Sequence, residues 1–324
     1  MQRDDSWITA HYLDGTGAAE KMSGALLPKD LAGDRCVWIQ LNMLEFAAKI
    51  WLREESRFPE VVVEALLADE TRPRCMMLGD SLLLNLRGVN MNPGADPADM
   101  VSIRIWANDR IIVSTQRRRL RAVNDVEKHL HDGTGPKNGA ELLDDLSDSL
   151  SERMSHVVSN ISDQVDQLEE MILDENEHET RTRLRALRRE VIGLRRYIAP
   201  QREAMAALAA EDISWIPPRE RQHIRSSADR LTLFVEDIDM VRERAAIIQD
   251  ELSSNLSERM NKNMYVLSIV AGIFLPLTLI TGLLGINVAG IPAADWPWAF
   301  AAVTGLLVLF GVAELFLLRR LHWL

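Results

Sequence analysis

The sequence predicts an α/β domain, followed by long α-helices and a two-helix transmembrane hairpin. Two observations support this fold class. The apolar residues gather in two carboxyl-terminal stretches, whereas the charged residues lie mostly before Asn263. Upstream, runs with strand character alternate with helical stretches and then give way to long, strongly charged helical segments. With 324 residues, the chain is long enough for more than one packed unit.

The composition disfavours some partners. The formal net charge is −11, which argues against nucleic acid because neutralising phosphates requires clustered Lys and Arg side chains. The same charge is compatible with attraction of cations. The two cysteines, Cys36 and Cys75, form no CxxC pattern and are expected to be buried free thiols rather than metal ligands. No basic segment followed by an apolar one opens the chain, so we expect no signal peptide and a cytosolic amino-terminal domain.

Residues 1–140 are expected to form the cytosolic α/β domain. The expected strands lie at residues 36–42 and 77–91, and the expected helices at residues 42–53, 59–67 and 122–130. Residues 101–115 hold two β-rich runs around Asn108-Asp109, which predicts an antiparallel hairpin. The Gly- and Pro-rich residues 131–139 mark the end of this domain.

Residues 141–216 are expected to form a charged helical hairpin. Only one basic residue, Arg153, interrupts the acidic segment 141–179, and the sign of the charge reverses over residues 181–202. Helical spacing is kept by the apolar residues Ile161, Val165, Leu168 and Ile172. Two antiparallel helices of opposite charge would neutralise each other or a neighbouring subunit.

The alternative is that the acidic helix binds or attracts metal. Its candidates for an inner metal site are Asp174, Glu177 and His178. Carboxylates on one amphipathic helix more often form a solvated face, and the sequence leaves both interpretations open.

One very long helix is predicted next. Proline is favoured in a first helical turn, and Pro218 is followed by no Pro or Gly from Arg219 to Ala271. Apolar periodicity continues, so we expect an uninterrupted helix from Pro218 to near Leu284, of about 100 Å at 1.5 Å per residue. Its cytosolic stalk, residues 217–263, requires partner helices because a helix of this length is not stable alone.

The carboxyl-terminal end is predicted to cross a membrane twice. Residues 264–284 contain no Asp, Glu, Lys, Arg or His and match a hydrocarbon core of about 30 Å. A second apolar span covers residues 298–318 and contains one charged residue, Glu314. The loop between them, residues 285–297, is too short for a domain, and a short tail at residues 319–324 follows. The alternative is a buried helical hairpin of a soluble protein.

The basic residues predict the orientation of this hairpin. They flank the two spans on one side, at Arg259, Lys262, Arg319 and Arg320. The connecting loop has no Lys or Arg and one acid, Asp295. The positive-inside rule therefore predicts that both termini are cytoplasmic and that Asp295 lies at the outer mouth.

The residues Gly285, Ile286 and Asn287 follow the first span directly. Here the chain resembles the CorA superfamily of divalent-cation transporters, whose signature is Gly-Met-Asn at this place, and most of all its zinc-transporting ZntB branch. The similar segments are Tyr265, FLPLT (274–278), TGLLGIN (281–287), AGIP (289–292), ETRPR (70–74), IIVST (111–115), GTGP (133–136) and RRYIAPQR (195–202). This resemblance implies a homopentameric funnel in the inner membrane, with the long helix of each subunit lining a central pore.

The spacing of residues on the first span can be compared with that expectation. Alternate steps of three and four from Asn261 reach Met264, Ser268, Ala271, Leu275, Thr278 and Gly282. This 3.5-residue repeat is typical of the seam of a left-handed bundle, and its residues are mostly small or weakly polar. We interpret the stripe as facing the pore. A packing seam is the alternative, because small residues also allow close helix contact.

The expected chemistry of such a pore is weak coordination. Five Asn287 side chains would present a ring of amide oxygens to a cation that keeps much of its hydration shell. The Thr278 hydroxyls could act further along, and Met264 and Leu275 would form apolar constrictions. No histidine or cysteine lies in either span, so a dehydrated tetrahedral zinc site is not expected.

The leading hypothesis is uptake of Zn2+ across the inner membrane without ATP, since no GxxxxGK[ST] motif is present. The resemblance also indicates proton coupling, for which Asp295, Glu314 and metal-bound water are candidates. No resident cofactor and no enzymatic activity are expected. A Mg2+, Co2+ or Ni2+ channel of the same superfamily is one alternative, and a membrane-anchored coiled-coil scaffold or sensor is another.

Overall fold

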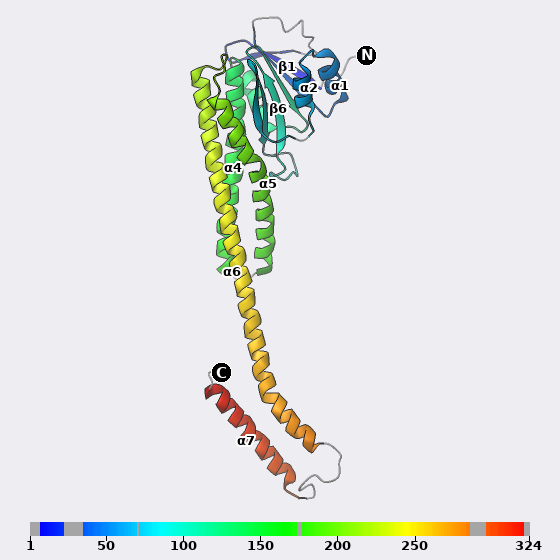
Figure 1. Ribbon diagram of the computed structural model, residues 1–324, viewed down its shortest axis with the longest axis vertical. Coiled ribbons are helices and arrows are strands. Elements are labelled where there is room, and N and C mark those ends of the chain that lie inside the picture. The colour runs from blue at the N-terminus through cyan, green and yellow to red at the C-terminus, as the bar shows by residue number, and fades with distance from the viewer. Residues whose placement is uncertain (1–6, 23–34, 70, 174–176, 286–295, 321–324) are drawn as a thin grey trace. The chain divides into compact units, whose positions relative to one another are not determined.

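The computed structural model describes residues 7–22, 35–69, 71–173, 177–285 and 296–320. The chain divides into two compact units, Met1–Gln249 and Asp250–Leu324, and Figure 1 shows their elements. The first unit contains a mixed sheet with its helices. The second contains the end of a long helix and one further helix.

The first unit is built on a seven-stranded sheet in the order β2-β1-β3-β7-β6-β5-β4. Its strands are β1 (Ile8–Leu13), β2 (Ala19–Met22), β3 (Val37–Asn42), β4 (Arg74–Leu78), β5 (Ser81–Gly88), β6 (Val101–Ala107) and β7 (Ile111–Gln116). The central pair β3 and β7 is parallel, and the other neighbouring strands are antiparallel.

The hairpin predicted at residues 101–115 is confirmed as β6 and β7. The side-chain oxygen of Asn108 accepts hydrogen bonds from the backbone N–H groups of Arg110 and Ile111, at 2.9 and 2.8 Å. The Asn108 N–H in turn donates to the carbonyl of Ile111. This local network explains why the sequence signal was clear, because Asn can replace backbone partners within a turn.

Two strand predictions need correction. The single strand expected over residues 77–91 is wrong, because the chain turns at Gly79, whose φ of +61° suits glycine. Two antiparallel strands, β4 and β5, result. Strands β1 and β2 were not predicted, since β2 is short and mostly exposed and gives no apolar alternation.

Helices cover both faces of the sheet. One face packs against α1 (Phe46–Ile50), η2 (Trp51–Glu55) and α2 (Glu60–Leu67), in a core that includes Val37, Ile39, Leu41, Val62, Leu66 and Val113. The opposite face carries α3 (Arg121–His131), to which the Gln40 side chain of β3 donates a hydrogen bond at Glu127 (3.0 Å). Figure 1 shows α1 and α2 on one side of the strands and α4 on the other.

Three long helices continue the chain. They are α4 (Gly139–Leu173), α5 (Glu177–Ala210) and α6 (Pro218–Leu284), and α7 (Ala299–Arg320) follows in the second unit. The uninterrupted helix expected from Pro218 to near Leu284 is confirmed. Residues buried on α6 repeat every seven positions at Leu231, Ile238, Ala245 and Leu252, and again at Phe234, Val241 and Ile248. Tertiary packing of this seam stabilises the stalk, as its length requires.

The two cysteines provide a test of the packing in the first unit. Both are free thiols, as expected, and are half-buried. Burial, with the nearby charge of Asp109, raises the pKa of Cys36 to about 12, and burial with Glu211 raises the pKa of Cys75 to about 11. Because the thiolate is the nucleophile, we expect iodoacetamide to label neither residue in the native protein near neutral pH.

Mass spectrometry before and after denaturation measures this reactivity. Both thiols are expected to react in denaturant within the time that leaves the native protein unlabelled. Rapid labelling of Cys36 in the native protein would contradict the packing described here.

Candidate ion pathway

The second unit contains two helices that are long and apolar enough to cross a membrane. One is the carboxyl-terminal part of α6 and the other is α7. Because the apolar residues surround both helices, neither could be a surface helix of a soluble protein, where a polar face is required. The outward-facing side chains of both, such as Phe274 and Phe316, are exposed in the isolated chain.

The membrane part of α6 has two distinct faces. Ile269, Ile273 and Ile280 are half-buried, and they lie one or two helical turns apart on the same side. On α7 the half-buried residues are likewise confined to one face, at Val303, Leu307, Gly311, Glu314 and Leu318. Since α6 and α7 are the helices of this unit, we take these to be the faces through which they approach each other.

The predicted stripe lies on the opposite side of α6. Met264 is nine residues from Ile273 and Leu275 is two residues from it. At 100° per residue, both side chains lie about 160–180° around the helix from Ile273. Their side chains are 60% and 68% exposed. Asn261, Ser268, Thr278 and Gly282 are exposed as well, and Ala271 is half-buried. Apart from Ala271, the chain leaves this stripe uncovered, and other molecules must cover or hydrate it.

Two hydroxyl groups on the stripe differ in their bonding. The Ser268 hydroxyl donates to the carbonyl of Met264 at 2.8 Å, one turn earlier in the helix. The Thr278 hydroxyl makes no hydrogen bond to any part of the chain that the structure describes. Ser268 thus retains acceptor capacity only, whereas Thr278 has both a donor and an acceptor for a hydrated ion.

Gly285 ends the long helix. Its N–H donates to the carbonyls of Thr281 (2.9 Å) and Gly282 (3.2 Å). An added Cβ would lie 3.1 Å from the Thr281 oxygen, which is closer than most side chains tolerate. The other predicted mouth residues, Ile286, Asn287 and Asp295, lie outside the described residues.

Glu314 lies on the inner face of α7 rather than at an exposed position. One of its carboxyl oxygens, Oε2, is buried and has no hydrogen-bond partner within the described residues. No ion pair joins it to Arg319 where the structure describes the chain. A carboxyl group in a membrane span is costly, so this position is of functional interest.

The inner metal site considered from the sequence gains little support. Glu177 lies 3.8 Å from Arg181 in an ion pair one turn along α5, and His178 is exposed. Asp174 lies outside the described residues. Where the structure describes the chain, no three His, Cys, Asp or Glu side chains are grouped to hold a metal ion.

The charged helices have a further ion-pair partner in α6. Arg244 of α6 donates to Asp166 and Glu169 of α4, at 2.6 and 2.7 Å. Arg195 of α5 likewise donates to Asp239 of α6, at 2.6 Å. These hydrogen bonds raise the pKa of Arg244 and lower that of Asp239. Helix α6 thus provides charge partners for both its neighbours, which the sequence did not predict; neutralisation of α4 and α5 by each other or by a neighbouring subunit stays a prediction.

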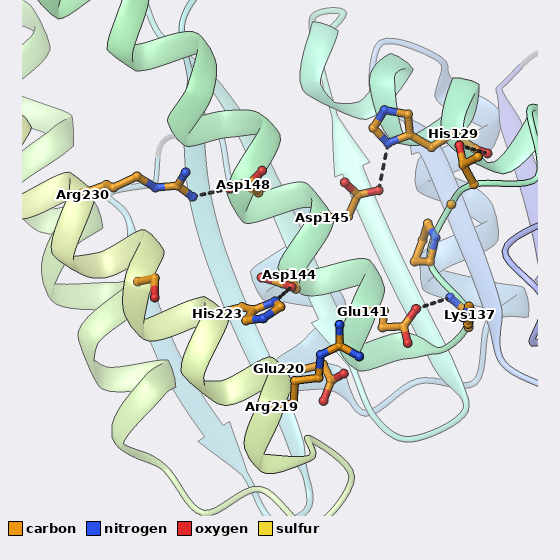
Figure 2. A pocket seen from close by; sticks show the side chains of 14 residues that line it. His129, Lys137, Glu141, Asp144, Asp145, Asp148, Arg219, Glu220, His223 and Arg230 are labelled. Carbon is orange, nitrogen blue, oxygen red and sulfur yellow. Dashed lines mark hydrogen bonds and ion pairs between the residues drawn. The ribbon is translucent and has the colours of Figure 1, made fainter.

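A second polar cluster lies where α3, α4 and the start of α6 meet (Figure 2). His129 Nδ1 lies 3.2 Å from Asp145 Oδ2, and His223 Nδ1 lies 2.9 Å from Asp144 Oδ2. Burial raises the pKa of both aspartates, although the histidines act in the opposite direction. The two pairs tie α4 to α3 and to α6. In Figure 2 they point to different sides of α4, so they form two ties rather than one ligand set.

The fold and the two apolar helices are those of a membrane transporter. The CorA-like Mg2+ transporter protein family matches residues 33–320. The chain belongs to this family. It is a divalent cation transporter with two carboxyl-terminal transmembrane helices, and not an enzyme.

Individual relatives are similar to this chain over nearly its whole length. The divalent cation transporter CmaX of Pseudomonas aeruginosa is 39% identical over 322 residues, which cover 98% of this chain and 96% of that protein. The zinc transport protein ZntB of Yersinia enterocolitica is 33% identical over 318 residues, with the same coverage. The solved structure of full-length CmaX matches all of both chains with a TM-score of 0.83 and 38% identity.

The raised pKa values of Asp144 and Asp145 predict a pH effect on stability. The folded state holds these protons more tightly than the unfolded state, so the free energy of unfolding decreases as pH rises through the range above 3.8. The double variant Asp144→Asn/Asp145→Asn is expected to remove this decrease. Thermal unfolding of the detergent-solubilised chain over a pH series measures it.

Asp239 provides a control of opposite sign. Its pKa is lowered, first by the hydrogen bond from Arg195, so its stabilising contribution is present above 3.8 and lost as pH falls. Asp239→Asn should therefore flatten the acid side of the profile and leave the effect of Asp144 and Asp145 intact. If the free energy of unfolding of Asp144→Asn/Asp145→Asn still decreased with pH as in the wild type, these two aspartates would not be the cause of the decrease.

Proposed function

We propose that this transporter carries Zn2+ inward across the inner membrane, through a pore along the axis of a homopentamer. The observation that carries the proposal is the uncovered stripe on α6. It runs along a helix segment without charged residues, on the side opposite to the face near α7. Five copies of this stripe would enclose an axial path, and each copy would cover the others.

The chemistry of the stripe supports passage of a hydrated cation. Hydroxyl and amide groups can hydrogen-bond the ion's water without replacing it, and they bind less tightly than carboxylates. The exposed side chains of Met264 and Leu275 would narrow the path with apolar rings. A ring of Asn287 amides at the outer entrance would select and concentrate cations before this narrow part.

The direction follows from the proposed orientation. Basic residues precede the first span and follow the second, whereas the connecting loop has no Lys or Arg, which supports cytoplasmic termini and an outer loop. A negative potential inside the cell would then draw a divalent cation inward without ATP, by about 4–5 kcal/mol per 100 mV for two charges.

Zinc is proposed over magnesium on the basis of two relationships. The ZntB relatives are named as zinc transport proteins, and the central motif residue is Ile286 where the wider superfamily has Met. The family description names Mg2+, which makes magnesium the second candidate. The name of the CmaX relative specifies only a divalent cation.

Ion flux into proteoliposomes tests the proposed function directly. We expect Zn2+ uptake that exceeds Mg2+ uptake, measured with a fluorescent indicator for each ion, with and without an inward proton gradient. Asn287→Ala should abolish most of the Zn2+ flux, because the entrance would lose its ring of amides. The control Asn263→Ala removes the same group from α6 outside the stripe and should leave the flux unchanged. Magnesium flux without zinc flux would refute the choice of ion.

The Thr278 hydroxyl provides a finer test of the pathway. Thr278→Val keeps the shape of the side chain and is expected to lower Zn2+ flux about two- to tenfold, as loss of one hydrogen bond of about 0.5–1.5 kcal/mol would. The matched control is Thr304→Val on α7, whose hydroxyl donates to the carbonyl of Phe300 at 2.8 Å. Equal losses in both variants would show that the stripe is a packing seam.

A further inference from the structure

A crevice in the first unit is lined by none of the residues of the proposed ion path. It lies beyond the carboxyl ends of the two central strands, β3 and β7, where Asn42 is paired with Gln116. Its volume is about 780 Å³, within the range of about 300–1,000 Å³ that is typical of small-molecule sites.

The path of the chain explains why a crevice forms there. After β3 the chain enters α1, on the face where Leu41 is part of the core. After β7 it enters α3, on the opposite face, where Gln40 donates to Glu127. Two adjacent parallel strands whose connections leave to opposite faces create a gap between those connections. In open α/β sheets this is the place where ligands bind.

The rim of the crevice is strongly basic although the whole chain carries a net charge of −11. Three consecutive residues, Arg117, Arg118 and Arg119, follow β7 and line it. Arg117 pairs with Asp69 and Arg118 with Asp99, in exposed ion pairs that contribute little and that an anion could displace. Arg119 is exposed, and it forms no ion pair with the residues that the structure describes.

Helix α3 adds to this positive field. It begins at Arg121, after Leu120, which has no side chain that can cap the first N–H groups, and no acid lies in its first turn. A cation at the positive end of a helix dipole is unfavourable, so four arginines in five residues here destabilise the free protein. An anion bound near these arginines would relieve this repulsion. Asn124 of the same helix lines the crevice.

The remaining lining holds one acid, Glu127, whose carboxylate accepts the hydrogen bond from Gln40, and is otherwise neutral and partly apolar. Asn92 Nδ2 donates to the Arg119 carbonyl at 3.1 Å and to Asn90 Oδ1 at 2.7 Å, which fixes the loop after β5 as a wall. Trp7 and Leu44 contribute apolar surface to the same crevice. A ligand with a charged end and a planar or apolar end would use both parts.

We propose that this crevice binds a phosphate-bearing metabolite of nucleotide size. Its phosphates contact Arg117, Arg118 and Arg119, and its ring lies against Trp7 and Leu44. Arginine is suited to this role because its planar guanidinium binds phosphate through two parallel hydrogen bonds. The site lacks a Walker-type loop, so binding rather than hydrolysis is assigned to it.

The test measures binding of ATP, inorganic triphosphate and adenosine to the full-length protein in detergent. EDTA is present throughout, so that metal bound by the probe or by the transporter does not contribute. Isothermal titration with the wild-type chain is expected to show saturable binding of ATP. Arg119→Gln should weaken this binding about tenfold or more, as loss of a charge-assisted contact predicts. The control Arg185→Gln removes the same charge from an exposed position on α5 and should bind like the wild type.

The probes also separate the two sources of phosphate. Tighter binding of ATP than of triphosphate, with the difference lost in Trp7→Phe, identifies a nucleotide. Equal binding of both, still sensitive to Arg119→Gln, identifies a free polyphosphate. Absence of saturable binding by any phosphate probe, or equal binding in Arg119→Gln and Arg185→Gln with unchanged circular dichroism, would overturn the proposal. These results do not depend on which metal ion the protein transports.

Discussion

The packing of one continuous helix governs the rest of this structure. Along its amino-terminal part, α6 buries a seam that repeats every seven residues, from Leu231 to Leu252. A 67-residue helix without such a seam would be unstable in water, because helical propensity alone does not stabilise it. Near its end, the same backbone has a covered side at Ile273 and an uncovered side at Leu275. Apolar residues outside the stripe, such as Phe274 and Leu279, are exposed in the same segment, so lipid or further subunits must cover this part of α6.

Polar contacts in the first unit have a complementary role. Helices α4 and α5 carry opposite charge, yet the arginine that binds two carboxylates of α4 is Arg244 of α6. Such pairs are partly exposed and add modest stability, but they favour one register of the helices over its alternatives. The aspartates that face His129 and His223 act differently, since their burial is costly for the charged form. These ties fix which faces of the helices meet, whereas the apolar seam provides most of the stabilisation.

The features that could be predicted from the sequence were those that depend on local residues or on regular spacing. The turn at Asn108 follows from short-range chemistry, and the long helix from apolar periodicity and the lack of Pro and Gly between Arg219 and Ala271, although Pro276 lies inside it. The turn at Gly79 was missed because apolar residues on both of its sides look like one strand. The pairing of Arg244 and the basic crevice could not be predicted, since they join residues far apart in the chain. The stripe on α6 was predicted from spacing, and only the structure adds that the chain leaves it uncovered.

The parallel pairing of β3 with β7 has a consequence for biosynthesis. Strand β3 cannot pair with β7 until Ile111 has been synthesised, because β4, β5 and β6 lie between Val37 and Ile111 in the sequence. Contacts of such high sequence separation form slowly, because the entropy of closing a long loop is lost first. The ribosome nevertheless completes β7 long before it reaches the apolar residues after Asn263. A growing chain therefore has time to complete its sheet before its apolar transmembrane segments leave the ribosome. These segments are exposed to water only until they insert into the membrane.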